Sequence, residues 1–85
     1  MGSKRHRIQM KIDVLRAISE GESLPTRIMY KSNLSWLPLH RILDEMLEDK
    51  LVEVTHASPH RSYSITEKGM WAMRAYRELV ENGLE

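Results

Sequence analysis

What the chain lacks excludes several classes of protein. It contains no cysteine, which excludes disulfides, thiolate catalysis and cysteine-ligated zinc, and which is compatible with a reducing compartment. No apolar run approaches the roughly 20 residues that a membrane-spanning helix needs. The first residues are basic and lack the apolar segment of a secretory signal. We therefore expect no membrane association and a cytoplasmic location.

Motifs for catalysis and cofactor binding are also missing. The sequence has no glycine-rich phosphate loop, no HExxH zinc motif and no nucleophile elbow. Acidic residues are paired by spacing within 44–49, but on an exposed helix face such pairs are typical of a solvated surface. The two histidines within 56–60 lack the further ligands that zinc requires. We expect no enzymatic activity, no cofactor, no metal and no small-molecule ligand.

The 85 residues are enough for one domain, with the ordinary apolar content (41%) of a globular protein. The net charge of +1 is too small to indicate a nucleic-acid partner, but its distribution is uneven. Residues 1–41 carry eight Lys or Arg against three acidic side chains, and residues 42–85 carry five against nine. This asymmetry favours one basic face, unless folding mixes the two halves. We expect a flexible basic arm at 1–7 and one domain at 8–85.

Apolar spacing predicts two helices in the first third of the chain. From residue 8 the apolar residues recur at steps of three and four, and Gly21 is placed to end that helix. Leu24, which precedes a proline, is expected in an extended link that can add a minimal third strand. Thr26 is expected as the N-cap of a short helix at 27–31.

A tight turn and a longer helix follow. Asn33 can take the left-handed conformation within the turn, and Ser35 is expected to cap a helix that ends near residue 49. Pro38 suits the third helical position, where its missing N–H has no intrahelical acceptor. The inward stripe of this helix comprises Leu39, Ile42, Leu43, Met46 and Leu47.

The second half of the chain predicts a hairpin and a last helix. Residues 51–56 and 61–65 alternate as half-buried strands around a polar turn. Thr66 is expected to cap a helix at 67–82, with Gly83 at its end. The order of elements predicts an α+β winged helix-turn-helix fold: a three-helix core, a β-hairpin wing and a C-terminal fourth helix.

Three stretches resemble the archaeal winged helix-turn-helix family, which includes the ten-kilodalton crenarchaeal chromatin protein. They are TRIMYKSNLSW at 26–36, the run at 43–52, and SYSITEKG at 62–69. The resemblance spans about residues 8–80 and implies archaeal relatives and duplex DNA binding. The last helix, about sixteen residues, is too short for the long antiparallel coiled coil of the chromatin protein. That protein's dimer is therefore not transferred to this chain.

In a helix-turn-helix, the first residues of the second helix reach the base edges of the major groove. Here these residues are Ser35, Trp36, Leu37, Pro38, His40 and Arg41. Arg41 can pair with guanine, whereas Leu37 and Pro38 can contact only apolar edges such as thymine methyls. Other interpretations remain open. Arg41 can instead pair with the glutamate four residues later. Trp36 can pack against the first turn of its helix and have a structural role only. Leu37 can cap the core.

Further cations are candidates for phosphate contact. Arg27 and Lys31 lie one turn apart on the short helix, His60 and Arg61 lie at the tip of the wing, and the arm supplies Lys4 and Arg5. The alternatives are a solvated helix face, an ordinary polar turn and an arm with only diffuse attraction.

The last helix carries apolar residues on more than one side, which is typical of a surface that binds a partner. We expect a homodimer interface formed by Trp71, Ala72, Tyr76 and Leu79. Alternatively, Trp71 folds back over the first helix to complete the core.

These observations favour a small archaeal DNA-binding protein. It would be a homodimeric transcriptional regulator or chromatin-associated protein of the nucleoid, with double-stranded DNA as its partner. The alternative is a winged helix that binds protein and not DNA. The near-neutral charge, the acidic second half of the third helix and the apolar last helix favour that alternative.

Overall fold

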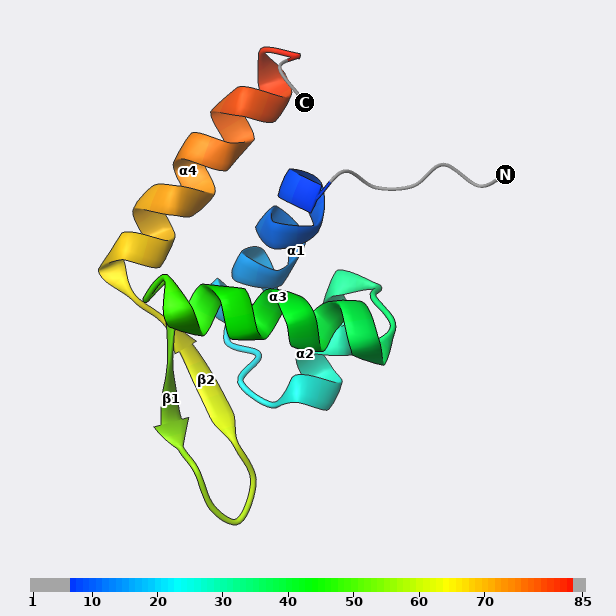
Figure 1. The fold of residues 1–85 in the computed structure, drawn as a ribbon, viewed down its shortest axis with the longest axis vertical. Coiled ribbons are helices and arrows are strands. Elements are labelled where there is room, and N and C mark those ends of the chain that lie inside the picture. Colours follow the sequence, from blue (N-terminus) through cyan, green and yellow to red (C-terminus); the bar gives the residue numbers. More distant parts are fainter. Residues whose placement is uncertain (1–6, 84–85) are drawn as a thin grey trace.

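A computed structural model describes residues 7–83. They form six elements, arranged as in Figure 1: α1 (Arg7–Ser19), α2 (Pro25–Ser32), α3 (Trp36–Glu48), β1 (Val52–His56), β2 (Ser62–Ile65) and α4 (Glu67–Glu81). The predicted α+β winged helix-turn-helix fold is confirmed. Arg7, which was expected in the N-terminal arm, is the first residue of α1. Lys4 and Arg5 lie outside the described residues.

The start of α2 differs from the prediction. The helix begins at Pro25, and Leu24 occupies the N-cap position in an extended conformation, so Thr26 is not the cap. A proline fits the first helical position because its φ is already helical and its missing N–H has no partner there. Without a capping side chain at Leu24, this proline is the local signal that starts the helix.

The turn between α2 and α3 follows the prediction. Asn33 has φ 57°, and its N–H donates to the carbonyl of Tyr30 at 3.2 Å. The N–H of Leu34 donates to Met29 at 3.2 Å, which satisfies a second carbonyl at the helix end. The partly buried Leu34 side chain packs against the core.

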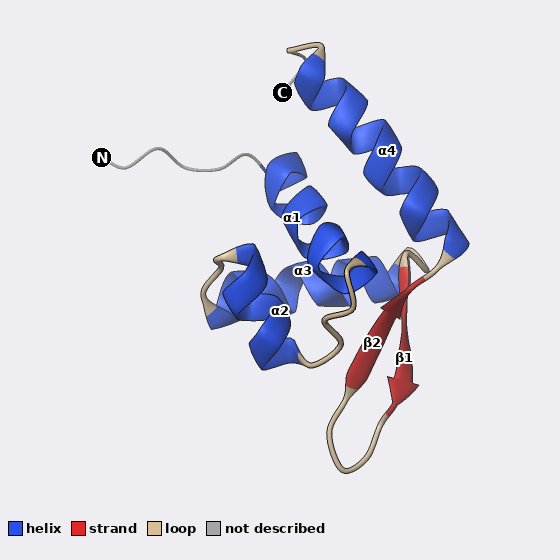
Figure 2. Cartoon of the chain, turned by 180° about the vertical axis from the view of Figure 1, so that it is seen from behind, coloured by secondary structure: helices blue, strands red, loops and turns tan. Residues whose placement is uncertain are grey.

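Ser35 occupies the predicted N-cap position of α3, although its side chain makes no capping hydrogen bond. Pro38 is the third helical residue, as expected. Four residues of the predicted stripe, Leu39, Ile42, Leu43 and Met46, are buried in the core, and the fifth, Leu47, is half-buried against it. Around it, α1 packs against α2, α4 and β2, and Figures 1 and 2 show α1 between α2 and α4.

The wing is an antiparallel hairpin in which Val52 pairs with Ile65 and Val54 pairs with Tyr63. The second strand begins at Ser62, one residue later than expected. The expected third strand is reduced to one hydrogen bond, from the Tyr63 N–H to the Ser23 carbonyl at 2.9 Å. In the described part of the chain the sheet has two strands.

One threonine fixes the direction of α4. Thr66 caps the helix as predicted, because its hydroxyl oxygen accepts from the Gly69 N–H at 3.0 Å. The same hydroxyl donates to the Lys50 carbonyl at 2.7 Å, and the Thr66 N–H donates to the Leu51 carbonyl at 3.0 Å. These bonds join the start of α4 to the segment that connects α3 with the wing. No helix in residues 7–83 has the length and apolarity of a membrane span.

Candidate nucleic-acid interface

The first half of α3 presents an open outer face. Trp36 is 49% exposed, Leu37 is 58% exposed, and Ser35 and Arg41 are also exposed. Because Leu37 points to solvent, the interpretation that it caps the core is wrong. Arg41 makes no hydrogen bond or ion pair with any residue in 7–83. Its guanidinium is therefore available to an external acceptor.

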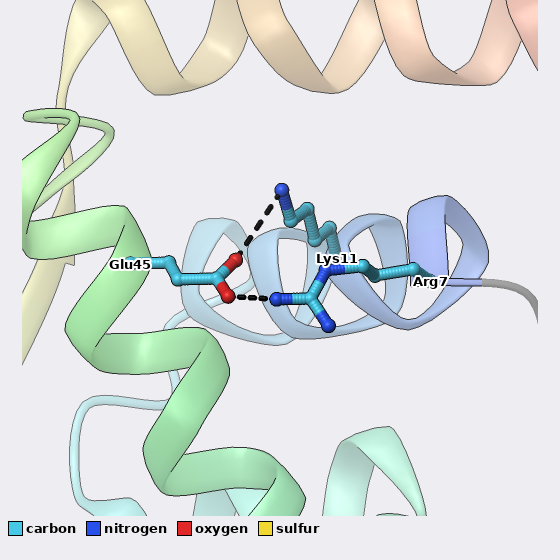
Figure 3. A network of polar contacts seen from close by, with 3 residues as sticks. All are labelled: Arg7, Lys11 and Glu45. Carbon is cyan, nitrogen blue, oxygen red and sulfur yellow. Dashed lines mark hydrogen bonds and ion pairs between the residues drawn. The ribbon is translucent and has the colours of Figure 1, made fainter.

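Glu45, the acidic residue one turn after Arg41, is engaged elsewhere in the described chain. Its carboxylate contacts the guanidinium of Arg7 and lies 3.5 Å from the Lys11 ammonium, so both partners come from α1 (Figure 3). The alternative pair between Arg41 and Glu45 is wrong, because Glu45 turns toward α1. Ion pairs this exposed contribute about 0–1 kcal/mol to stability. Their larger effect is on the charge of the surface, because the two cations neutralise one carboxylate in the acidic half of α3.

Trp36 and His40 contact each other on the outer face. Their ring centroids lie 4.3 Å apart with the planes at 75°, an edge-to-face arrangement. His40 is half-buried, and its ring limits the orientations of the more exposed indole.

The outer face of α2 carries both expected cations and one residue that the prediction missed. Arg27 Nε lies 3.5 Å from Glu22 Oε1, and Lys31 Nζ lies 3.7 Å from Glu20 Oε1. Tyr30 is 81% exposed, the most open of the large apolar side chains in the described chain. Its helical spacing was a usable signal, because a helix that turns Ile28 inward directs Tyr30 outward.

The tip of the wing is exposed from His56 to Arg61, and Figure 1 shows its loop projecting away from the helices. His60 is open to solvent. Arg61 lies just before β2 and contacts that strand, since its Nη1 lies 3.4 Å from the Tyr63 hydroxyl. The wing thus offers two exposed imidazoles, those of His56 and His60, and one guanidinium that is weakly held.

A second surface lies on α4, where the four expected interface residues separate. Trp71 is 65% exposed, with the Arg74 guanidinium 5.8 Å from its ring, so the interpretation that it covers α1 is wrong. Ala72, Tyr76 and Leu79 are half-buried, and the first two pack against the core. Next to Trp71 lies a depression of about 480 Å³, lined by Asp49, Leu51, Lys68, Trp71, Ala72, Ala75 and Tyr76.

Comparison with known proteins agrees with this architecture. A family model described as winged helix-turn-helix matches residues 4–83. An uncharacterized protein of Methanocaldococcus jannaschii, MJ0287, is 28% identical over 78 residues, which are 92% of this chain and 76% of that protein.

Two solved structures share the fold. The structure of Sso10a-2, a DNA-binding protein from Sulfolobus solfataricus, has a TM-score of 0.83 at 22% identity, over 91% of this chain and 80% of that chain. The structure of Lactococcus lactis ZitR in complex with DNA has a TM-score of 0.69 at 20% identity, over 99% of this chain and 58% of that chain.

Proposed function

Because the chain belongs to the winged helix-turn-helix family, we propose that it binds duplex DNA through the first half of α3. The observation that carries this proposal is Arg41, an exposed guanidinium without a partner among residues 7–83, at the position where such helices meet base edges. Sso10a-2 is described as a DNA-binding protein, and ZitR was solved in complex with DNA, so both support the proposal.

The surrounding residues have distinct proposed roles. Arg41 donates to a guanine edge, and Ser35, His40 and the Trp36 indole N–H contact the adjacent backbone or bases. Arg27 and Lys31 approach phosphates along α2, since their pairs with glutamates are exposed and weak. His60 and Arg61 on the wing, with Lys4 and Arg5 of the N-terminal segment, add phosphate or minor-groove contacts.

We further propose that the protein is a transcriptional regulator or a chromatin-associated protein of the nucleoid, acting as a homodimer. The exposed Trp71 and the depression beside it support an interface on α4. In Figures 1 and 2, α4 and α2 lie on opposite sides of α1, so an α4 interface leaves the α2 and α3 surface free.

The test is a binding titration against random-sequence duplex DNA at two salt concentrations. The logarithm of the affinity should fall with the logarithm of salt by about 0.9 per phosphate contact. Arg41→Gln should weaken binding by about 1–3 kcal/mol. Arg77→Gln removes an exposed arginine from α4 and should leave the affinity unchanged.

Absence of binding at low salt, or equal affinities for the Arg41 and Arg77 variants, would contradict the proposal. The second candidate function, a protein-binding adaptor, would then be preferred. It is favoured by the exposed Met70 and Trp71 on α4 and by the outward carboxylates of Asp44 and Glu48. An adaptor would retain its partner after Arg41→Gln and lose it after Trp71→Ala.

A further inference from the structure

Three large side chains stand exposed on either side of the turn between α2 and α3. They are Tyr30, Trp36 and Leu37, which we call the aromatic surface. The Tyr30 carbonyl accepts a hydrogen bond from the turn residue Asn33, and α3 begins at Trp36, so the two aromatic residues flank one tight turn. Exposed apolar groups that gather in this way usually mark an interaction site.

Reading of a duplex leaves this surface mostly unused. Base edges in the major groove are recognised by polar side chains, and an apolar side chain there can contact little besides a thymine methyl. Arg41, His40 and Ser35 are the polar side chains proposed for that task. Tyr30 and Trp36 offer ring area, which matches the flat faces of bases that are not paired and stacked in a helix.

Both rings have surface available for stacking. Trp36 meets His40 at 75°, so the two rings are not stacked face to face, and about half of the Trp36 surface is open. Tyr30 makes no ring contact or side-chain hydrogen bond within residues 7–83. Neither residue belongs to the hydrophobic core, so substitution of either should leave the fold intact.

Cations are carried by the same two helices as the aromatic surface, which favours a polyanionic ligand. Arg27 and Lys31 come from α2 and Arg41 comes from α3. The two α2 cations have glutamate partners at 3.5 and 3.7 Å, but such exposed pairs are weak enough for a phosphate to replace the carboxylate. Farther along α3, Asp44 and Glu48 are exposed and acidic, which restricts the favourable field to a short segment.

We propose that the aromatic surface binds a short stretch of single-stranded DNA. Unpaired bases stack on Trp36 and Tyr30, and their phosphates pair with the arginines and the lysine around them. Binding of this kind tolerates many sequences, because every base has a face to stack. The inference rests on the proposed function in that the same face meets nucleic acid. It shares Trp36 and the cations with the proposed duplex site and adds Tyr30, which that site does not use.

The chain has two tryptophans, which allows a direct test. In a Trp71→Phe variant, Trp36 is the only tryptophan, and oligothymidylate should quench its fluorescence saturably. In a Trp36→Phe variant, the remaining Trp71 on α4 should not respond. A Trp36 signal that does not change with oligothymidylate would overturn the proposal.

Affinities separate this site from the duplex site. Trp36→Ala and Tyr30→Ala should each weaken oligothymidylate binding at least about fivefold, and Tyr30→Ala, which removes no proposed duplex contact, should weaken duplex binding less than about twofold. Trp36→Phe should retain binding because it keeps a ring, and Arg77→Gln, at an exposed position on α4, is the control that should change neither affinity. If Tyr30→Ala weakens both ligands equally, the aromatic surface belongs to the duplex site and this inference fails. If neither ligand binds, the proposed function fails as well.

Discussion

Gly69 shows how one residue sets the contact between two elements. It is buried in the first turn of α4, where a Cβ would lie 2.1 Å from the Leu51 carbonyl oxygen and 2.7 Å from Ile65 Cγ1. The same Leu51 carbonyl accepts the Thr66 N–H. A side chain at position 69 must therefore push against backbone, which cannot move without breaking this junction.

We accordingly expect Gly69→Ala to lower the free energy of unfolding by about 1–3 kcal/mol, the usual cost of overpacking. Urea denaturation followed by circular dichroism measures the change. Lys68→Ala, on the exposed side of the same turn, should change stability by less than about 0.5 kcal/mol. Equal stabilities of the two variants would show that α4 can shift to admit a methyl group.

Residues governed by their sequence neighbours were predictable. Thr66 as a cap and Asn33 in the left-handed conformation follow from the chemistry of three or four adjacent residues. Glu45 was not predictable, because its partner Arg7 is 38 positions away and only the packing of α1 beside α3 brings the two together. The side on which Trp71 is exposed has the same origin, since the orientation of α4 is fixed by tertiary contacts.

The helices share one way of ending. Each described helix is followed by a residue with positive φ, namely Gly21, Asn33, Lys50 and Gly83. After α3, the Lys50 N–H donates to Leu47 at 3.1 Å and the Leu51 N–H donates to Met46 at 2.8 Å, the bonds of a Schellman motif. Lys50 has φ 62°, a conformation that costs a residue with a Cβ about 1–2 kcal/mol.

Lys50→Gly should therefore raise the free energy of unfolding by up to about 1 kcal/mol, after the greater backbone entropy of glycine in the unfolded chain is subtracted. The Lys50 side chain is exposed, so its removal should cost little. Asp49→Gly is the matched control: position 49 has φ −82°, and glycine there should destabilise. A thermal melt in which both variants lose stability would contradict the explanation.

The ends of an element were predictable to within one or two residues where the apolar spacing and a residue that starts or stops helices indicated the same boundary. Pro38 and the apolar spacing after it determined α3 in this way. The start of α2 was misassigned because Thr26 and Pro25 are both good initiators, and the proline comes first. The expected third strand is not part of the sheet in the described residues, where a single hydrogen bond joins the Tyr63 N–H to the Ser23 carbonyl.

At the scale of the whole molecule, folding redistributes the charge asymmetry of the sequence. Arg7 and Lys11 come from the basic half of the chain and are engaged by Glu45 from the acidic half. The exposed cations that remain beside the aromatic surface are those of α2 and Arg41. A candidate DNA-binding face therefore extends over the two helices of the helix-turn-helix, and it is narrower than the sequence alone suggested.

A second exposed apolar surface lies on α4, on the other side of the molecule, and it leads to a prediction about assembly. Trp71 and the neighbouring Met70 are exposed beside the depression on α4. Apolar surface in contact with water raises the free energy of the protein unless a partner covers it. A two-fold contact there would hold two helix-turn-helix faces outward, as two half-sites of duplex DNA require. We expect the wild-type protein to sediment as a dimer and Trp71→Ser to sediment as a monomer.

The dimer also has a consequence for DNA binding. Loss of the second copy removes the avidity of two linked sites, so Trp71→Ser should weaken binding to long duplex DNA without changing the affinity for a short half-site. Trp36→Ser removes the other exposed tryptophan, from α3, and should leave the mass at that of the dimer. Tyr76→Ser is a poorer probe because Tyr76 also packs against the core. If Trp71→Ser retains the dimer mass, the interface lies elsewhere, and the exposed tryptophan belongs to a site for a different partner.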